Sequence, residues 1–355
     1  MADNRMAPRA PPVDLVPSGT QPSDLVRAYQ ESELAPATVR SYRVAWGAWL
    51  AWHSARFPTT SYRAWNGETV TQSSSALPAA PHAVAEYIAH LAASGSPMAT
   101  IRHRLAVISR AHMTAGYRSP TADPAVRTTL RGIARTHGSA QRQAAPLLVE
   151  HIRTAVHQVM QTTGPRALRD RALLLVGWSC GMRVSELVGL GVADLEWDAG
   201  ASDGCVLWLR RSKTDQEGRG RGVRLAHGSG LTDPLTALRE WETARIELVT
   251  PHWQNEKLRA ALWFELRGDR EVTGRPMGQD AVTRLVKRVA GAQGLSPARY
   301  SSHSLRRGLV TSLLMAGRSV PAVQSLTGHR SVGTVARYAD AARLAQESPA
   351  EGLGL

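Results

Sequence analysis

Apolar residues in the first half of this chain recur mostly at the three- to four-residue spacing of an α-helix. In residues 35–57 this spacing predicts an amphipathic helix that has Pro36 in its first turn, with apolar positions at Val39, Tyr42, Trp46, Trp49, Leu50 and His53. Further helices are predicted at 81–94, 98–115 and 123–136, separated by breaks rich in Ser, Gly and Pro. The first half is therefore expected to be an all-helical bundle.

The second half is predicted to combine helices with a small antiparallel sheet. Residues 205–210 alternate between apolar and polar, and 221–226 can return beside them across the loop 212–220. Helices are predicted at 148–160, 166–177, 185–189, 233–249, 279–293, 304–316, 320–327 and 331–338. The fold class is therefore expected to be mainly α.

Breaks in the pattern suggest where the domains begin and end. Residues 1–22 are rich in Pro and polar residues without periodicity, which is typical of a disordered leader. The polar segment 137–145 is the predicted linker between two domains. A chain of 355 residues usually needs more than one core, so we expect domains at 23–136 and 146–355.

Composition points to a polyanionic partner and a reducing compartment. Lysine and arginine outnumber aspartate and glutamate by 43 to 29, which gives a net charge of +14. The two cysteines, Cys180 and Cys205, lie in apolar stretches, which argues against a disulfide framework or a zinc site. The longest apolar run, 172–176, is too short to span a bilayer. We expect a soluble, cytoplasmic protein with no membrane partner.

The motifs that the sequence lacks narrow its chemistry. There is no His-Glu-x-x-His, no clustered Asp-x-Asp and no Gly-x-x-x-x-Gly-Lys-Ser/Thr loop. The Gly-Arg-Gly-Arg-Gly run at 218–222 lies between predicted strands instead of opening a helix. Metal-dependent hydrolysis and nucleoside triphosphate hydrolysis are therefore disfavoured, and neither a metal nor a cofactor is expected.

Cations and one tyrosine gather instead in short motifs of the second half. These motifs are Gly-Met-Arg-Val-Ser-Glu-Leu at 181–187, Arg-Ser-Lys-Thr at 211–214, His-Ser-Leu-Arg-Arg-Gly at 303–308, Leu-Thr-Gly-His-Arg-Ser at 326–331 and Arg-Tyr at 337–338. Each motif has a structural explanation when taken alone. An Arg183–Glu186 pair, for example, is an ordinary contact on a helix surface.

Taken together, the motifs resemble the tyrosine recombinase (phage integrase) family. His-x-x-Arg, Leu-x-Gly-His and a tyrosine nine positions after that histidine follow the order of the family's C-terminal signature. The resemblance extends over almost the whole chain. It implies a SAM-like helical core DNA-binding domain followed by a catalytic domain of the DNA breaking-rejoining fold, which together close around duplex DNA.

The function implied by this resemblance is that of a Cre- or Xer-like site-specific recombinase. Such an enzyme cuts and rejoins duplex DNA through a 3′-phosphotyrosine intermediate without metal or ATP. Two other classes remain open: a type IB topoisomerase or hairpin-forming resolvase with the same chemistry, and a DNA-binding protein whose site is vestigial.

The residue roles also come from the resemblance, and they agree with the chemistry. Attack on a phosphodiester builds negative charge on oxygen, which preorganised arginine forks neutralise. By resemblance, Tyr338 is the nucleophile, Arg183 and Arg306 bind the phosphate, and Lys213 is the general acid. His303 would assist proton movement at the tyrosine, and His329 would donate a hydrogen bond to the phosphate. Glu186 is expected to orient the site.

The expected partner is double-stranded DNA that carries paired inverted half-sites. In the family, helices of the first domain lie against the DNA major groove. By resemblance, the matching segments of this chain place Arg40, Arg43, Arg102, Arg104 and Arg110 there. Further phosphate contacts are expected from Arg211, Arg307 and Arg330. The tryptophans at 46, 49 and 52 are expected to pack in a core instead of stacking on bases.

Self-association is expected to depend on the end of the chain. Residues 340–347 are predicted to form a short amphipathic helix that docks on a neighbouring protomer. The protein would then bind one site as a dimer and join two sites as a homotetramer, in association with the nucleoid.

Overall fold

The computed structural model describes residues 34–58, 60–63, 69–72, 75–138, 143–197, 204–210, 220–329, 331, 333, 335–336 and 338. These residues form two compact units, one ending at Gly138 and the other starting at Gln143. The break between the units falls within the predicted linker. The described residues do not include several that carry predictions. These are the leader 1–22, Arg211, Lys213, Arg330 and the tail helix 340–347.

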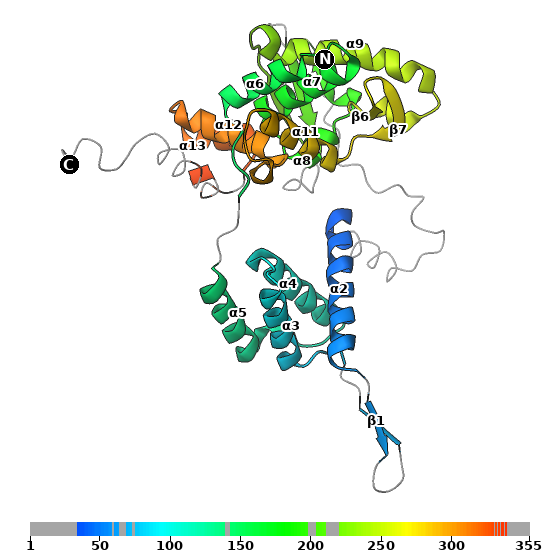
Figure 1. The fold of residues 1–355 in the computed structure, drawn as a ribbon, viewed down its shortest axis with the longest axis vertical. Helices are drawn as coiled ribbons and strands as arrows, with labels where there is room; N and C mark the ends of the chain where they lie inside the picture. The colour runs from blue at the N-terminus through cyan, green and yellow to red at the C-terminus, as the bar shows by residue number, and fades with distance from the viewer. Residues whose placement is uncertain are drawn as a thin grey trace, which may run out of the picture. The chain divides into compact units, whose positions relative to one another are not determined.

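The first unit is a helical bundle with one added hairpin. Its helices are α2 (Pro36–Arg56), α3 (Pro81–Ala93), α4 (Met98–Thr114) and α5 (Pro124–His137). Helix α3 packs against α5 and α2 packs against α4 (Figure 1). Proline begins α2, α3 and α5, where its missing N–H is no loss. The Asp123 side chain caps α5 by accepting from the Ala125 amide at 2.8 Å.

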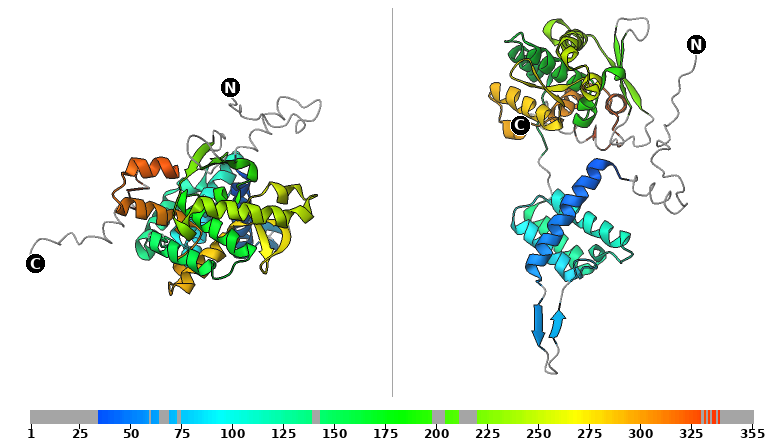
Figure 2. Two further views of the ribbon diagram at one scale, coloured as in Figure 1. Left: turned by 90° about the horizontal axis from the view of Figure 1, so that it is seen from above. Right: turned by 90° about the vertical axis from the view of Figure 1, so that its right-hand side faces the viewer.

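The hairpin corrects the expectation that this unit is all-helical. Strands β1 (Thr60–Arg63) and β2 (Thr69–Gln72) pair antiparallel and extend beyond the end of α2 (Figure 2). Their sequences, Thr-Ser-Tyr-Arg and Thr-Val-Thr-Gln, contain too few apolar residues to produce a two-residue hydrophobic period. Pattern analysis could not detect them for that reason.

The tryptophans of α2 pack in the core of the first unit, as predicted. Trp49 is fully buried, and its ring centroid lies 5.8 Å from that of Trp52 and 5.1 Å from that of Tyr87. The expectation for Leu50 was wrong, because this residue is 41% exposed. The buried stripe of α2 runs through Ala45, Trp49 and His53 at four-residue spacing, so Leu50 lies about 100° away from it.

The second unit is built around helix α7. Its helices are α6 (Val149–Val159), α7 (Pro165–Ser179), α8 (Val184–Val188), α9 (Pro234–Val249), α10 (Glu256–Ala260), α11 (Gln279–Ala292), α12 (His303–Met315) and α13 (Val320–Thr327). Helix α7 packs against α6, α9 and α12, which buries it from Arg169 to Gly177. Both cysteines of the chain are buried in this unit as free thiols.

The small sheet of the second unit has the strand order β3-β4-β5. Strands β4 (Cys205–Leu209) and β5 (Arg221–Leu225) pair antiparallel with Leu207 opposite Val223, so the predicted pairing is confirmed. Three strands were not predicted. They are the short β3 (Leu195–Trp197) and the two strands of a separate hairpin, β6 (Phe264–Arg267) and β7 (Glu271–Pro276). Strand β3 is too short to show alternation.

The segment that opens the second unit crosses helix α12 at very close range. The Leu147 amide donates to the Ser304 carbonyl at 3.0 Å, and the Leu147 carbonyl accepts from Trp178 Nε1 at 2.8 Å. A Cβ atom on Gly308 would lie 1.7 Å from that carbonyl oxygen. Only glycine lets the segment approach α12 this closely, so this contact helps fix α12 against the start of the unit.

Replacement of Gly308 by alanine is therefore expected to destabilise the second unit by about 3 kcal/mol, because backbone atoms must move to admit the methyl group. Chemical denaturation of the full chain measures this change. The matched control is Gly132→Ala in α5, where an added Cβ meets nothing within 4 Å, and this variant should be equal to or slightly more stable than the wild type. Equal stability of the Gly308→Ala variant and the wild type would contradict the close contact.

Candidate active site

A single buried carboxylate, that of Glu186, organises the start of helix α8. Its Oε2 accepts from the Arg183 backbone amide at 2.9 Å, and its Oε1 accepts from Arg183 Nη1 at 2.6 Å. The Glu186 side chain is only 1% exposed. The carboxylate thus caps the helix and holds the Arg183 guanidinium at the same time. The predicted orienting role of Glu186 stays a prediction.

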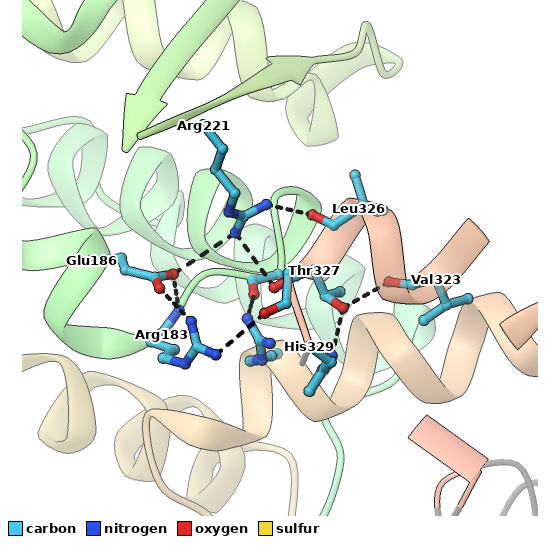
Figure 3. Close-up of polar contacts among 10 residues, drawn as sticks. Arg183, Glu186, Arg221, Val323, Leu326, Thr327 and His329 are labelled. Carbon is cyan, nitrogen blue, oxygen red and sulfur yellow. Dashed lines mark hydrogen bonds and ion pairs between the residues drawn. The ribbon is translucent and has the colours of Figure 1, made fainter. Parts of the chain in front are cut away.

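Arg221 is a second arginine of this cluster, and the sequence analysis missed it. Its Nη1 donates to the Leu326 carbonyl at 2.7 Å, and its Nη2 lies 3.9 Å from Glu186 Oε2 (Figure 3). Arg221 opens β5 and shares its strand face with the buried Val223 and Leu225. Strand alternation could have identified it, because an arginine on the buried face of a strand needs polar partners.

Arg306 supplies the third guanidinium and is almost completely buried. It is 2% exposed, and its Nη1 donates to the Gly181 carbonyl at 2.6 Å. Its Nη2 is buried without a hydrogen-bond partner in the described part of the chain. Burial and the positive charge of Arg183 lower the pKa of Arg306 to about 10, although Glu186 acts in the opposite direction. An unpaired buried donor beside an excess of positive charge is suited to an anion.

His329 follows the turn that ends helix α13. Gly328 takes the left-handed conformation there, with φ 65° and ψ 40°, which glycine adopts readily. His329 Nδ1 lies 2.6 Å from the Thr327 hydroxyl oxygen. Burial, followed by the charges of Arg306 and Arg183, lowers the pKa of His329 to about 4. The ring is therefore neutral near pH 7.

His303 lies one helical turn before Arg306 on α12. The His303 side chain is exposed to solvent, but it lies next to the cluster of arginines. Desolvation by the surrounding protein, followed by the charges of Arg306, Arg307 and Arg183, lowers the pKa of His303 below its usual value. Both influences favour the neutral imidazole, which can accept a proton.

Tyr338 lies beside the arginine cluster and packs in a small group of apolar side chains. It is 9% exposed and packs with Val310, Val323 and Val335. Its ring centroid lies 6.3 Å from that of His329, and Arg307 Cζ lies 4.9 Å from the tyrosine centroid. Arg307 also donates to the Gln143 side chain. Arg307, whose role as a DNA contact stays a prediction, thus lies over the tyrosine ring.

The structure brings together the described members of the predicted site. Arg306 interacts electrostatically with Arg183, Glu186 and Tyr338, and His329 interacts with His303. Arg40, Arg43 and Arg102 lie in the other unit and are exposed. Arg104 there is half-buried and donates from Nη1 to the Val44 carbonyl at 3.2 Å, and Arg110 is also half-buried.

Within the described ranges, no group of three or more His, Cys, Asp or Glu side chains is arranged to hold a metal ion. None of the helices described here has both the length and the apolar character needed to cross a membrane.

Comparison with known proteins points to one family. Residues 148–344 match the model of the phage integrase family. An integrase/recombinase xerD homologue of Selenomonas ruminantium is 28% identical over 267 residues, which cover 74% of each chain. The tyrosine recombinase XerD of Xanthomonas axonopodis pv. citri is 32% identical over 183 residues, which are 50% of this chain and only 53% of that protein.

A solved structure shares the fold. The XerH site-specific recombinase, crystallised with a palindromic difH substrate in a post-cleavage complex, superposes with a TM-score of 0.54. The match covers 78% of this chain and 73% of that chain at 18% identity. This likeness confirms the mainly α fold with small antiparallel sheets.

The shared carboxylate leads to a prediction about stability. Glu186→Gln should destabilise the protein by about 3 kcal/mol, because Arg183 and Arg221 lose the negative charge that compensates their burial. Urea unfolding of the full chain measures the effect. The matched control is Glu150→Gln on α6, whose side chain is 61% exposed, and its effect should stay within about 0.5 kcal/mol. A Glu186→Gln variant as stable as its control would show that the carboxylate is not needed to hold the cluster.

Proposed function

This chain belongs to the phage integrase family and is a tyrosine recombinase, and we propose that it recombines specific duplex DNA sites through a 3′-phosphotyrosine intermediate formed by Tyr338. One observation carries the proposal. Three guanidinium groups surround one carboxylate beside Tyr338, and a buried donor of Arg306 remains unpaired among the described residues. This arrangement is suited to the phosphate of a DNA strand.

The reaction is a transesterification in which bonds are exchanged. The Tyr338 oxygen attacks the phosphorus, the bond to the 5′ oxygen breaks, and the 3′ phosphate becomes linked to the tyrosine. The 5′ hydroxyl of a partner strand then reverses the step on the new duplex. Because one phosphodiester bond replaces another, no ATP is consumed. Arg183 and Arg306 stabilise the charge that develops on the non-bridging oxygens, which is the task that a metal ion performs in other enzymes.

Two proton transfers accompany this exchange. A phenol ordinarily has a pKa near 10, so the Tyr338 hydroxyl must pass its proton to a base when it attacks. His303 is neutral because its pKa is lowered, and it stands on the same helix as Arg306. We assign His303 to that role. The departing 5′ oxygen needs a proton in return, and we assign its donation to Lys213 by the family resemblance.

The DNA partner would contact both units. The net charge of +14 supports binding to the phosphate backbone. We propose Arg40, Arg43, Arg102, Arg104 and Arg110 as contacts of the first unit, and Arg211, Arg307 and Arg330 as contacts of the second. The same proposal includes a DNA site made of paired inverted half-sites. The protein would bind each site as a dimer and join two sites as a tetramer through residues 340–347. It would act in the cytoplasm at the nucleoid. A duplex selected from a random library by the full chain provides the substrate for the tests.

Tyr338→Phe is expected to abolish covalent attachment to this duplex and to leave specific binding within about twofold, because one hydroxyl is lost and no cation is removed. A nicked duplex that traps the intermediate, resolved on a denaturing gel, measures attachment, and a mobility-shift titration measures binding. A covalent adduct formed by the variant would rule out Tyr338 as the nucleophile.

Cleavage is expected to continue at an unchanged rate in excess EDTA, because arginines neutralise the phosphate. Binding should weaken steeply as salt concentration rises, since phosphate neutralisation releases counterions. The same trapping assay, run with and without chelator after extensive dialysis, provides the measurement. Loss of cleavage that added Mg²⁺ restores would require a metal-dependent mechanism.

Lys213→Ala tests the assignment of the general acid. The variant should cleave normal DNA about 100-fold more slowly than the wild type, in line with the usual contribution of a general acid. It should recover most of that loss on DNA with a bridging 5′-phosphorothiolate, whose sulfur departs without a proton. Equal defects on both substrates would reduce Lys213 to a phosphate contact.

A further inference from the structure

The Thr327 hydroxyl makes two short contacts that together determine where the protons of His329 lie. Its Oγ1 is 2.6 Å from the Val323 carbonyl oxygen and 2.6 Å from His329 Nδ1 (Figure 3). Thr327 is fully buried at the end of α13. A hydroxyl has a single proton to donate, so it can serve as donor in only one of the two contacts.

Only one assignment satisfies both contacts. A carbonyl oxygen cannot donate, so the contact with Val323 must use the hydroxyl proton. The contact with His329 must then use a proton on Nδ1, which the Thr327 oxygen accepts. A neutral imidazole carries one proton. The Nε2 atom of neutral His329 is therefore an acceptor and cannot donate to a phosphate.

We propose that Thr327 is a positioning residue that fixes this tautomer of His329, so that His329 takes up a proton when DNA enters the site and donates to the phosphate only as the imidazolium. This inference rests on the proposed function, because it concerns the hydrogen bond from His329 to the scissile phosphate. The proton comes from solvent and binds to Nε2, and no bond to carbon or phosphorus changes in this step.

Burial and the positive charges around His329 explain why its ring is neutral before DNA arrives. The groups that act on it from the neighbouring elements are Arg183 before α8, Arg221 of β5, His303 and Arg306 of α12, and the Tyr338 ring. Glu186 lies behind Arg183 and Arg221, and Arg307 lies over the Tyr338 ring. Burial and the arginines lower the pKa of His329 to about 4. A phosphodiester brings a negative charge into contact with the ring and stabilises the imidazolium. Protonation is thereby coupled to occupation of the site.

The first test reads the tautomer directly and needs neither DNA nor activity. Nitrogen chemical shifts of His329 in the full-length protein near pH 7 should show a protonated Nδ1 and a bare Nε2. Thr327→Ser should keep this pattern, because the hydroxyl remains. Thr327→Val should lose it. A wild-type ring with its proton on Nε2 would overturn the inference, whatever the fate of the proposed function.

The second test follows the rate of covalent attachment to the nicked duplex as pH rises. The wild type and Thr327→Ser require a proton on His329, so their rates should fall as that proton is lost. In Thr327→Val the neutral ring can carry its proton on Nε2 and donate it to the phosphate. The rate of this variant relative to the wild type should therefore rise about tenfold for each pH unit in the alkaline range, since one proton is involved. A constant ratio would overturn the inference.

A matched control separates this effect from loss of a helix contact. Thr243 on α9 donates to the Arg239 carbonyl at 3.1 Å, the same four-residue contact that Thr327 makes, and it lies on the exposed surface. Thr243→Val should reproduce the wild-type pH profile. If it changed the profile as Thr327→Val does, the effect would not arise from His329, and the inference would fail. A wild-type protein that forms no adduct at any pH would contradict the proposed function, while the tautomer measurement would still stand.

Discussion

The site depends on the burial of one carboxylate among three guanidinium groups. Glu186 is fixed by the helix that it caps, and it holds Arg183 directly while Arg221 lies just beyond hydrogen-bond distance. One negative charge cannot balance three positive ones, so the cluster retains an excess of positive charge in a desolvated setting. Burial, followed by that excess of positive charge, lowers the pKa values of His303 and His329. A buried donor of Arg306 also remains without a partner in the described ranges. A phosphate would supply the missing negative charge.

The fold brings these groups together from distant parts of the chain. Arg183 is the residue before α8, Arg221 begins β5 and Arg306 lies on α12. The close approach of Leu147 to Gly308 helps fix the position of α12. Arg221 also binds the carbonyls of Leu326 and Thr327, so the strand is tied to the turn that carries His329. Movement of any one of these elements would alter the distances among the cations. In the proposed reaction, this preorganisation would let fixed charges meet the developing charge without rearrangement.

The candidate site residues were grouped from the sequence because their short motifs resemble a family signature, and the structure brings those that it describes together. His303 and Arg306 are one helical turn apart, and His329 follows a glycine that ends a helix, so local chemistry is visible in the sequence. Arg221 was missed because its role depends on carbonyls about 105 residues away along the chain. The β1–β2 hairpin and the exposure of Leu50 were missed for a different reason. The hairpin leaves no periodic hydrophobic pattern in the sequence. Tertiary packing decides which apolar residues of α2 are buried, and it leaves Leu50 41% exposed.

The most direct test of a preformed phosphate site is a crystal structure of the Tyr338→Phe variant bound to its selected duplex. A preformed site predicts that the non-bridging oxygens of one phosphate lie within hydrogen-bond distance of Arg183, Arg306 and His329. It also predicts that Glu186 keeps its contacts with Arg183 and that the Nη2 atom of Arg306 gains a partner. A phosphate bound elsewhere, or a cluster that must separate from Glu186 to reach the DNA, would contradict it.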